Sequence, residues 1–293
     1  MNVKIVGRGV WGKALLSVVS QNCKTVSTLD RGEESNDHEV LILALPTEAI
    51  REALTRLPFS KENKIIVNTT KGIETSTHFL PYKIVQELYG ETIEYYSLVG
   101  PSFAQEVVDK MPTMVNLGYV RESKNNEKIK SLFQTNYFQV RLTNGVAALE
   151  LSAAFKNIYA IVCGLADGLG YGTNTRVKLL VLAIEEMYNL HRALRCSIDV
   201  NSTVGTTGDL ILTCNSTESR NFTFGKLLAQ YSTDEALRQI GSTVEGVNSL
   251  SSVEHFSQLA QIELPLASLV GQIVKLNNPQ EVKKVFDEFI HVG

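Results

Sequence analysis

Short apolar runs alternate with longer segments of helical character through the first half of the chain. The runs are rich in β-branched and aromatic residues, and most end at or beside Gly, Pro, Asn or Asp, which is typical of strands. They are Val3–Val6, Thr25–Leu29, Glu39–Leu45, Lys64–Thr69, Tyr95–Val99, Thr113–Tyr119 and Tyr137–Leu142. Thr47–Leu57 and Leu80–Tyr89 lie between such runs and are typical of helices. This alternation predicts an α/β fold: a doubly wound parallel sheet of Rossmann type with helices on both faces.

The pattern changes after Thr143. The segment Val146–Ala166 is apolar nearly all round, which is typical of a helix buried in a core. The further helices expected from the pattern are Val177–Leu194, Phe222–Ala229, Thr233–Ile240 and Val247–Gln261. Because no strong strand signal separates them, we predict two domains: residues 1–143, which form the α/β domain, and residues 144–293, which form an all-helical domain.

Composition and charge narrow the class of protein. The chain has 293 residues, of which 44% are hydrophobic and 20% charged, as in ordinary globular proteins. Its net charge is −3, whereas proteins that bind nucleic acid usually carry an excess of basic residues. Uninterrupted apolar runs such as Ile158–Ala166 are shorter than the ~20 residues that span a bilayer, so we expect no membrane insertion. The four cysteines stand far apart, which favours reduced thiols, no metal site and a cytoplasmic location.

A glycine motif follows the first predicted strand directly. The segment Gly7–Gly12 reads G-x-G-x-x-G and leads into a predicted helix. In dinucleotide-binding folds the first glycine permits a tight turn and the second lets backbone approach a pyrophosphate. The third lets the helix pack closely on the strand. Gly7, Gly9 and Gly12 therefore predict a dinucleotide site, with a purely structural glycine turn as the alternative.

Two residues of opposite charge follow the second predicted strand. Asp30 stands roughly where an acidic residue, ~20 residues beyond the glycines, accepts hydrogen bonds from the ribose of NAD. Arg31 comes next, and an arginine there accommodates the 2′-phosphate of NADP. Because the two effects oppose each other, we expect the protein to use both NAD and NADP with weak discrimination.

Lys156 lies inside the apolar helical segment. A desolvated lysine can exchange a proton with a carbonyl or alcohol oxygen near neutral pH. The alternative is a lysine whose long side chain carries its charge out to solvent. The sequence pattern alone favours the second interpretation slightly.

Three further groups are candidates for binding an anion. Ser219 precedes a predicted helix as a possible N-cap, and Arg220 and Asn221 follow it, which would suit a phosphate. Lys71 follows a strand of the predicted parallel sheet, at the edge where ligands bind. Asp209 lies in Gly205–Leu210, which we expect to be a turn between helices. A capped surface helix and a solvated turn carboxylate are the alternatives.

Taken together, eight motifs along nearly the whole chain resemble the NAD(P)-dependent glycerol-3-phosphate dehydrogenases. They are Gly7–Gly12, Thr70–Glu74, Gly100–Glu106, Phe155–Ala160, Asp167–Asn174, Gly208–Cys214, Ser219–Asn221 and Val244–Gly246. The resemblance implies interconversion of dihydroxyacetone phosphate and sn-glycerol 3-phosphate by hydride transfer with NAD or NADP. It further implies a role in phospholipid synthesis and, from the family alone, a homodimer.

The resemblance also implies roles for individual residues. Lys156 would be the general acid in ketone reduction and the base in alcohol oxidation, while Lys71 and Asp209 would orient the reacting oxygens. The other substrate contacts implied are Gly100, Ser102, Asn157, Thr213, Ser219, Arg220 and Asn221. The cofactor contacts implied beyond the glycines, Asp30 and Arg31 are Val10, Trp11, Lys71, Ala104, Arg220 and Glu245.

The sequence departs from the family pattern in three places. The segment between Asp30 and the strand that begins at Glu39 is shorter than in many members, and Ala153 replaces a glycine. Phe222 and Thr223 stand where arginine is frequent. Two other readings stay open: a related two-domain dehydrogenase for a hydroxy acid or nucleotide sugar, and a cofactor-sensing protein without turnover. The sequence Ser219–Asn221 argues against the first, and the pair of Lys156 and Asp209 against the second.

Overall fold

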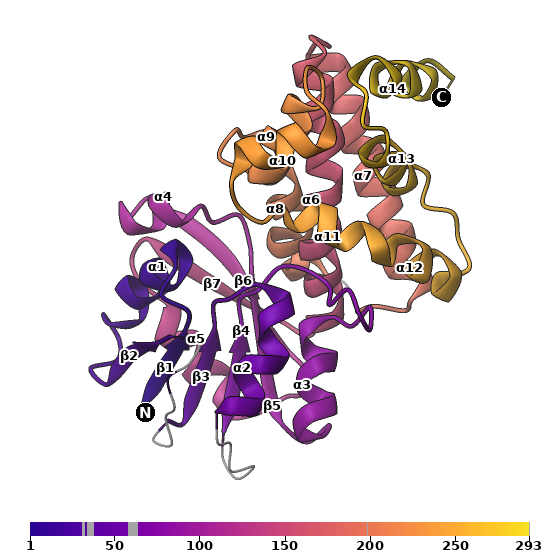
Figure 1. Ribbon diagram of the computed structural model, residues 1–293. Helices are drawn as coiled ribbons and strands as arrows, with labels where there is room; N and C mark the ends of the chain where they lie inside the picture. Colours follow the sequence, from indigo (N-terminus) through magenta and orange to yellow (C-terminus); the bar gives the residue numbers. More distant parts are fainter. Residues whose placement is uncertain (31–32, 34–37, 58–63, 198, 293) are drawn as a thin grey trace. The chain divides into compact units, whose positions relative to one another are not determined.

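The computed structural model describes residues 1–30, 33, 38–57, 64–197 and 199–292 (Figure 1). The chain forms two compact units. The first consists of Met1–Leu151 and Ser197–Thr206, and the second of Ser152–Cys196 and Thr207–Gly293. The first unit is an α/β sheet structure and the second is helical, which confirms the predicted fold class.

The first unit contains a seven-stranded sheet with the order β2-β1-β3-β4-β5-β6-β7. The strands are β1 (Val3–Val6), β2 (Val26–Leu29), β3 (Val40–Leu43), β4 (Ile65–Asn68), β5 (Glu94–Val99), β6 (Thr113–Tyr119) and β7 (Phe138–Thr143). All neighbouring strands run parallel except β5 and β6, which pair antiparallel. The sheet is therefore parallel, as predicted, except at this one pair. The short connection through α4 (Ala104–Val108) returns the chain alongside β5 in the opposite direction.

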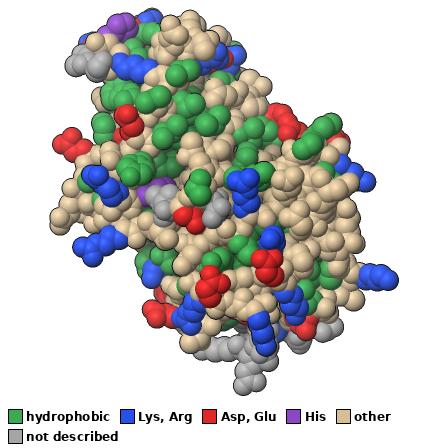
Figure 2. All heavy atoms as spheres, turned by 180° about the vertical axis from the view of Figure 1, so that it is seen from behind, with side chains coloured by type: hydrophobic (Ala, Val, Ile, Leu, Met, Phe, Trp, Pro, Cys, Tyr) green, Lys and Arg blue, Asp and Glu red, His purple; other side chains and the backbone are tan. Residues whose placement is uncertain are grey.

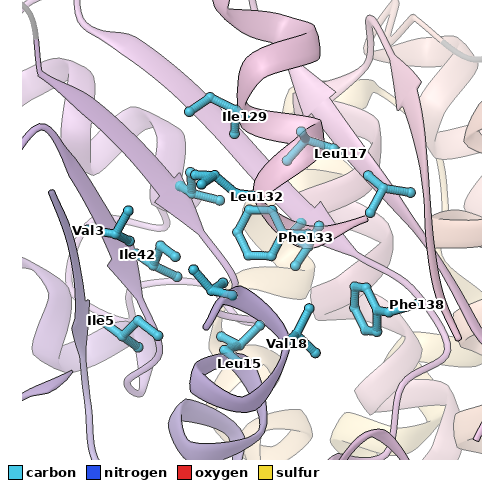
Figure 3. Close-up of a cluster of buried hydrophobic side chains, with 14 of the residues drawn as sticks. Val3, Ile5, Leu15, Val18, Ile42, Leu117, Ile129, Leu132, Phe133 and Phe138 are labelled. Carbon is cyan, nitrogen blue, oxygen red and sulfur yellow. The ribbon is translucent and has the colours of Figure 1, made fainter. Parts of the chain in front are cut away.

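Helices cover both faces of this sheet because its strands alternate apolar side chains between the faces. On β3, Val40 and Ile42 pack with α1 (Val10–Val19), α4 and α5 (Asn125–Phe133). Leu41 and Leu43 pack on the opposite face with α2 (Ile50–Arg56), its preceding 3₁₀ turn η1 (Thr47–Ala49), and α3 (Pro81–Tyr89). Figure 3 shows the first cluster, in which Phe133 of α5 and Leu15 and Val18 of α1 lie among the strand residues. The sheet is doubly wound, as predicted.

The first unit extends beyond the predicted boundary at residue 143. The first turns of α6 (Val146–Gly168) belong to it, since Val146 packs in the cluster beneath α3 and Glu150 accepts hydrogen bonds from the sheet. The segment Ser197–Thr206, which includes η2 (Val200–Thr203), also belongs to it. The backbone N–H of Gly205 donates to Asn116 Oδ1 at 2.6 Å. Long-range bonds of this kind leave no local pattern in the sequence.

The second unit is built around the rest of α6. Its other elements are α7 (Thr173–Ala193), η3 (Val204–Gly208, shared with the first unit), α8 (Asp209–Cys214), α9 (Arg220–Leu227), α10 (Thr233–Ile240), α11 (Glu245–Ser249), η4 (Leu250–Ser252), α12 (Val253–Ala260), α13 (Pro265–Lys275) and α14 (Pro279–Val292). Two predictions are wrong here. The expected turn Gly205–Leu210 is helical, and the expected single helix Val247–Gln261 is divided by η4.

The helix α6 is long and apolar enough, by length and composition alone, to cross a membrane. However, 94% of its most apolar 18-residue window is buried inside the protein. The burial explains the apolar character that the sequence shows all round this segment, because every face of the helix meets other side chains. It is a core helix.

Candidate active site

The turn from β1 to α1 has the geometry that its three glycines predict. Gly7 has φ +118°, and a Cβ added there would lie 2.2 Å from the carbonyl oxygen of Ala44. A Cβ on Gly12 would lie 1.9 Å from the carbonyl oxygen of Gly7, so α1 packs against the turn only because Gly12 lacks a side chain. A Cβ on Gly9 would meet no atom of the described residues within 4 Å. The turn is thus open where α1 presents its first N–H groups, which fits the pyrophosphate of a dinucleotide.

The two residues after Gly9 differ in their surroundings. Val10 is 67% exposed at the start of α1. Trp11 is half-buried, and its indole Nε1 donates to Thr69 Oγ1 at 2.9 Å. The Thr69 hydroxyl donates in turn to the carbonyl oxygen of Leu43 at 2.6 Å. The glycine turn is therefore tied to the ends of β3 and β4.

Other predicted site residues of the first unit follow the carboxyl ends of parallel strands. Asp30 follows β2 and is exposed, whereas Arg31 lies outside the described residues. Lys71 follows β4, and its Nζ donates to the carbonyl oxygen of Gly100 at 3.1 Å. The hydroxyl of Ser102 donates to the same oxygen at 3.0 Å. The structure thus brings Lys71, Gly100 and Ser102 together, just before α4 begins at Ala104.

In the second unit, Lys156 is buried with a carboxylate. Its side chain is 5% exposed, and that of Asp209 is 1% exposed. The Nζ atom lies 2.5 Å from Asp209 Oδ1 and donates to Thr213 Oγ1 at 2.9 Å. The interpretation of Lys156 as a surface lysine is therefore wrong. A buried ammonium is retained only where a carboxylate and hydrogen bonds compensate for lost hydration, and both are present here.

The helix α8 places both partners of Lys156. Asp209 and Thr213 stand four residues apart, so they lie on the same face of α8. The Thr213 hydroxyl donates to the carbonyl oxygen of Asp209 at 2.6 Å, which leaves its lone pairs directed to the lysine. Asp209 is the first residue of a helix, not a residue of a solvated turn, and its carboxylate is fixed in place.

A second network connects α6, α9 and α11. The side-chain amide of Asn221 donates to Asn157 Oδ1 at 3.0 Å, and Asn221 Oδ1 accepts the backbone N–H of Gly246 at 2.8 Å. A Cβ on Gly246 would lie 2.4 Å from the carbonyl oxygen of Asn157. The glycine therefore allows α11, which begins at Glu245, to approach the residue next to Lys156.

The start of α9 has the predicted cap. The Ser219 hydroxyl accepts the backbone N–H of Phe222 at 3.3 Å. Arg220 is exposed, and its guanidinium makes no hydrogen bond to the described residues. Phe222, one of the departures from the family pattern, is buried, and its carbonyl oxygen would lie 1.9 Å from a Cβ on Gly164. Phe222 therefore serves the packing of α9 on α6, while Arg220 faces solvent.

Known proteins resemble the chain along nearly all of it. Residues 29–126 match the N-terminal part, and residues 145–286 the C-terminal part, of the NAD-dependent glycerol-3-phosphate dehydrogenases. The glycerol-3-phosphate dehydrogenase [NAD(P)+] of Staphylococcus haemolyticus is 31% identical, with 94% of each chain covered. That of a Thermoanaerobacter species is 35% identical over 87% of this chain and 77% of the relative. The crystal structure of glycerol-3-phosphate dehydrogenase from Coxiella burnetii superposes with a TM-score of 0.86 at 25% identity, covering 99% of this chain and 98% of that one.

The chain belongs to the NAD-dependent glycerol-3-phosphate dehydrogenase family. Membership confirms the predicted family resemblance and the NAD(P)-dependent dehydrogenase class. It disfavours the hydroxy-acid, nucleotide-sugar and sensor alternatives.

Both signs of charge occur on the surface of this dehydrogenase. Lys and Arg are interspersed with Asp and Glu on the face that Figure 2 shows. With a net charge of −3, the whole molecule gives an anionic substrate little long-range attraction. Binding of a phosphate therefore depends on a few placed donors.

One buried carboxylate near this dehydrogenase's Lys71 was not singled out from the sequence. Glu150 accepts hydrogen bonds from Asn68 Nδ2 at 3.1 Å, from the Tyr95 hydroxyl at 2.5 Å and from the Tyr82 N–H at 2.9 Å. The Asn68 amide also binds both the N–H and the carbonyl oxygen of Thr70, which precedes Lys71. Glu150, like Lys156, is a charged residue inside an apolar helical segment. The same sequence pattern could therefore have identified Glu150 as a candidate.

Burial of Glu150 predicts a measurable pH dependence of stability. It raises the pKa of the carboxyl to about 7, above that of the unfolded chain. The folded protein therefore holds the Glu150 proton more tightly than the unfolded chain does, and this difference stabilises the fold. The stabilisation is complete below about pH 4.3 and is lost as the pH rises towards 7. Relative to Glu150→Gln, we expect the wild-type free energy of unfolding to fall by about 2–3 kcal/mol between pH 5 and pH 8.

Urea unfolding of the first unit can be followed by the fluorescence of Trp11, the single tryptophan of the chain. Glu91→Gln, which removes an exposed carboxylate of the same unit, is the control and should track the wild type at each pH. Parallel pH curves for wild type and Glu150→Gln would show that Glu150 does not titrate in this range.

Proposed function

We propose that this protein interconverts dihydroxyacetone phosphate and sn-glycerol 3-phosphate with NAD or NADP. The observation that carries the proposal is the buried pair of Lys156 and Asp209, held by Thr213. A sensor of the cofactor needs no buried ammonium that can exchange a proton, whereas reduction of a ketone requires a proton donor.

Lys156 transfers the proton. In reduction, the Nζ–H bond breaks as an O–H bond forms on the former carbonyl oxygen, and the lysine then regains a proton from solvent. In oxidation, the neutral amine accepts the proton of the alcohol. Asp209 stabilises the ammonium form, and Thr213 fixes the direction of the amine. When bound, the nicotinamide supplies or accepts the hydride.

The remaining residues bind and orient. Ser219, Arg220 and Asn221 hold the phosphate, with Arg220 also reaching the cofactor, and Asn157 supports Asn221. Lys71, with Gly100 and Ser102, orients the substrate. The cofactor contacts are Gly7, Gly9, Val10, Trp11, Gly12, Asp30, Arg31, Lys71, Ala104, Arg220 and Glu245. The first unit serves as the dinucleotide-binding domain, and the second supplies proton transfer and phosphate binding.

In the cell, the product supplies phospholipid synthesis, and the protein acts in the cytoplasm as a homodimer. Support for the dimer comes from one face of α7, on which three apolar side chains are exposed: Val177, Val181 and Tyr188. Sedimentation equilibrium tests it: Val181→Glu should lower the dimer content, and an unchanged mass would contradict this face.

The oxidation direction tests the proposed substrate through its stereochemistry. With NAD or NADP in excess, sn-glycerol 3-phosphate should be oxidised, whereas its mirror image, sn-glycerol 1-phosphate, should be a poor substrate. Equal rates with both, or no reaction with either, would contradict the proposed function.

A further inference from the structure

Arg8, in the middle of the glycine turn, lies beside the end of β2. The strands β1 and β2 pair in parallel with Val6 opposite Leu29, and the Gly7 N–H donates to the carbonyl oxygen of Leu29 at 2.9 Å. The residue after Gly7 therefore starts level with the carboxyl end of β2. In this class of fold, that end recognises the adenosine ribose of the cofactor.

The Arg8 guanidinium is held there by two groups. Its Nη2 donates to both carboxylate oxygens of Glu33, at 2.9 and 2.7 Å. Its Nε donates to Thr28 Oγ1 on β2 at 3.4 Å. Glu33 Oε2 also accepts the backbone N–H of Asp30 at 3.1 Å. Glu33 thus connects the glycine turn to the residue that follows β2.

This ion pair is accessible and can exchange partners. The side chains of Arg8 and Glu33 are 46% and 45% exposed. Exposed ion pairs are weak, because each charge keeps much of its hydration. A phosphate close to Arg8 would compete with Glu33 for the guanidinium, since arginine binds phosphate through strong charge-assisted hydrogen bonds.

We propose that Arg8 and Glu33 determine which form of the cofactor this protein prefers. The inference rests on the proposed dinucleotide site. Glu33 accepts hydrogen bonds from the ribose hydroxyls of NAD and repels the 2′-phosphate of NADP. Arg8 binds that phosphate once Glu33 has moved away. Glu33 and Arg8 thus oppose a carboxylate to an arginine. The similar opposition predicted at Asp30 and Arg31 stays a prediction, since Arg31 lies outside the described residues.

Two nucleotides that lack nicotinamide test the proposal without turnover. Adenosine 5′-monophosphate carries the free 2′-hydroxyl, and adenosine 2′,5′-bisphosphate carries the 2′-phosphate. Their dissociation constants can be measured by isothermal titration calorimetry or by the fluorescence of Trp11 in the first turn of α1. Titrations with NADH and NADPH complete the set.

Glu33→Gln should bind the 2′,5′-bisphosphate about tenfold more tightly relative to the monophosphate than the wild type does, because the repelling charge is gone. Arg8→Ala should shift this ratio about tenfold in the opposite direction and leave monophosphate binding nearly unchanged. NADPH and NADH should follow the same ratios. Glu39→Gln is the control, because Glu39 lies at the amino end of β3, whereas Arg8 and Glu33 lie by the carboxyl ends of the strands. It should leave the ratio unchanged.

An unchanged ratio in Glu33→Gln would overturn the proposal. So would an equal loss of both nucleotides in Arg8→Ala, which would place Arg8 at the 5′-phosphate. If the wild type bound neither nucleotide, the dinucleotide site itself would be wrong, and the proposed function would fail with it.

Discussion

Replacing Lys156 with alanine is expected to lower kcat by at least ~100-fold, the low end of what a general acid contributes. The affinity for NADH should stay nearly the same, because Lys156 is not among the proposed cofactor contacts. Removing Lys156 takes away the ammonium that compensates the buried carboxylate of Asp209, so the variant should also lose stability. Steady-state kinetics with dihydroxyacetone phosphate, together with circular dichroism and NADH binding, separate the two effects.

A second variant distinguishes proton transfer from simple attraction. Lys156→Arg keeps a positive charge for Asp209, but a guanidinium does not give up its proton in proteins. We therefore expect it to fold better than Lys156→Ala and to remain at least ~100-fold impaired in kcat. Lys284→Ala, which removes an exposed lysine of α14, should match the wild type. Near-normal turnover in either folded Lys156 variant would show that another group moves the proton.

Loss of the phosphate contact should have the next largest effect. Arg220 is exposed beside the capped start of α9, and a planar guanidinium can hold two phosphate oxygens at once. Arg220→Lys provides a point charge without the fork, so we expect KM for dihydroxyacetone phosphate to rise roughly 10- to 100-fold. Dihydroxyacetone, which lacks the phosphate, should be a poor substrate of the wild type, since remote binding energy helps to orient the reacting carbon.

The control for this prediction is Arg238→Lys, the same change at an exposed arginine of α10. It should leave both kinetic constants unchanged. If the wild type reduced the two ketones with similar kcat/KM, the phosphate contact would be assigned to the wrong residues. If Arg220→Lys changed kcat alone, Arg220 would act on the reacting atoms and not on the phosphate.

The parts of the fold that depend on local pattern were predictable. The seven strands were located because each is a short apolar run, and the Ser219 cap because the residue type and its place before a helix suffice. The glycine turn could be interpreted residue by residue, since each glycine is required for a different steric reason. The structure confirms this at Gly7 and Gly12, where an added Cβ would collide with backbone atoms. These features need only neighbours in the sequence.

The parts that depend on distant neighbours were not predictable. Asp209 was predicted to lie in a turn, because glycines and threonines precede it and such a stretch is typical of turns. In the structure this stretch is helical, and contacts with residues distant in the sequence stabilise it. The antiparallel β6 and the extension of the first unit to Leu151 result from pairing and packing across the sheet. Lys156 was ambiguous for the same reason. Its partners stand 53 and 57 residues away, and only the fold decides between a surface lysine and a buried ion pair.

Reduction of dihydroxyacetone phosphate by this chain can be measured directly. Purified protein is mixed with NADH or NADPH, dihydroxyacetone phosphate is added, and loss of the reduced cofactor is followed by absorbance, with the product identified enzymatically. We expect stoichiometric formation of sn-glycerol 3-phosphate with both cofactors, and none with Lys156→Ala on the same time scale. A folded wild-type protein that binds NADH but leaves dihydroxyacetone phosphate unreduced would contradict it.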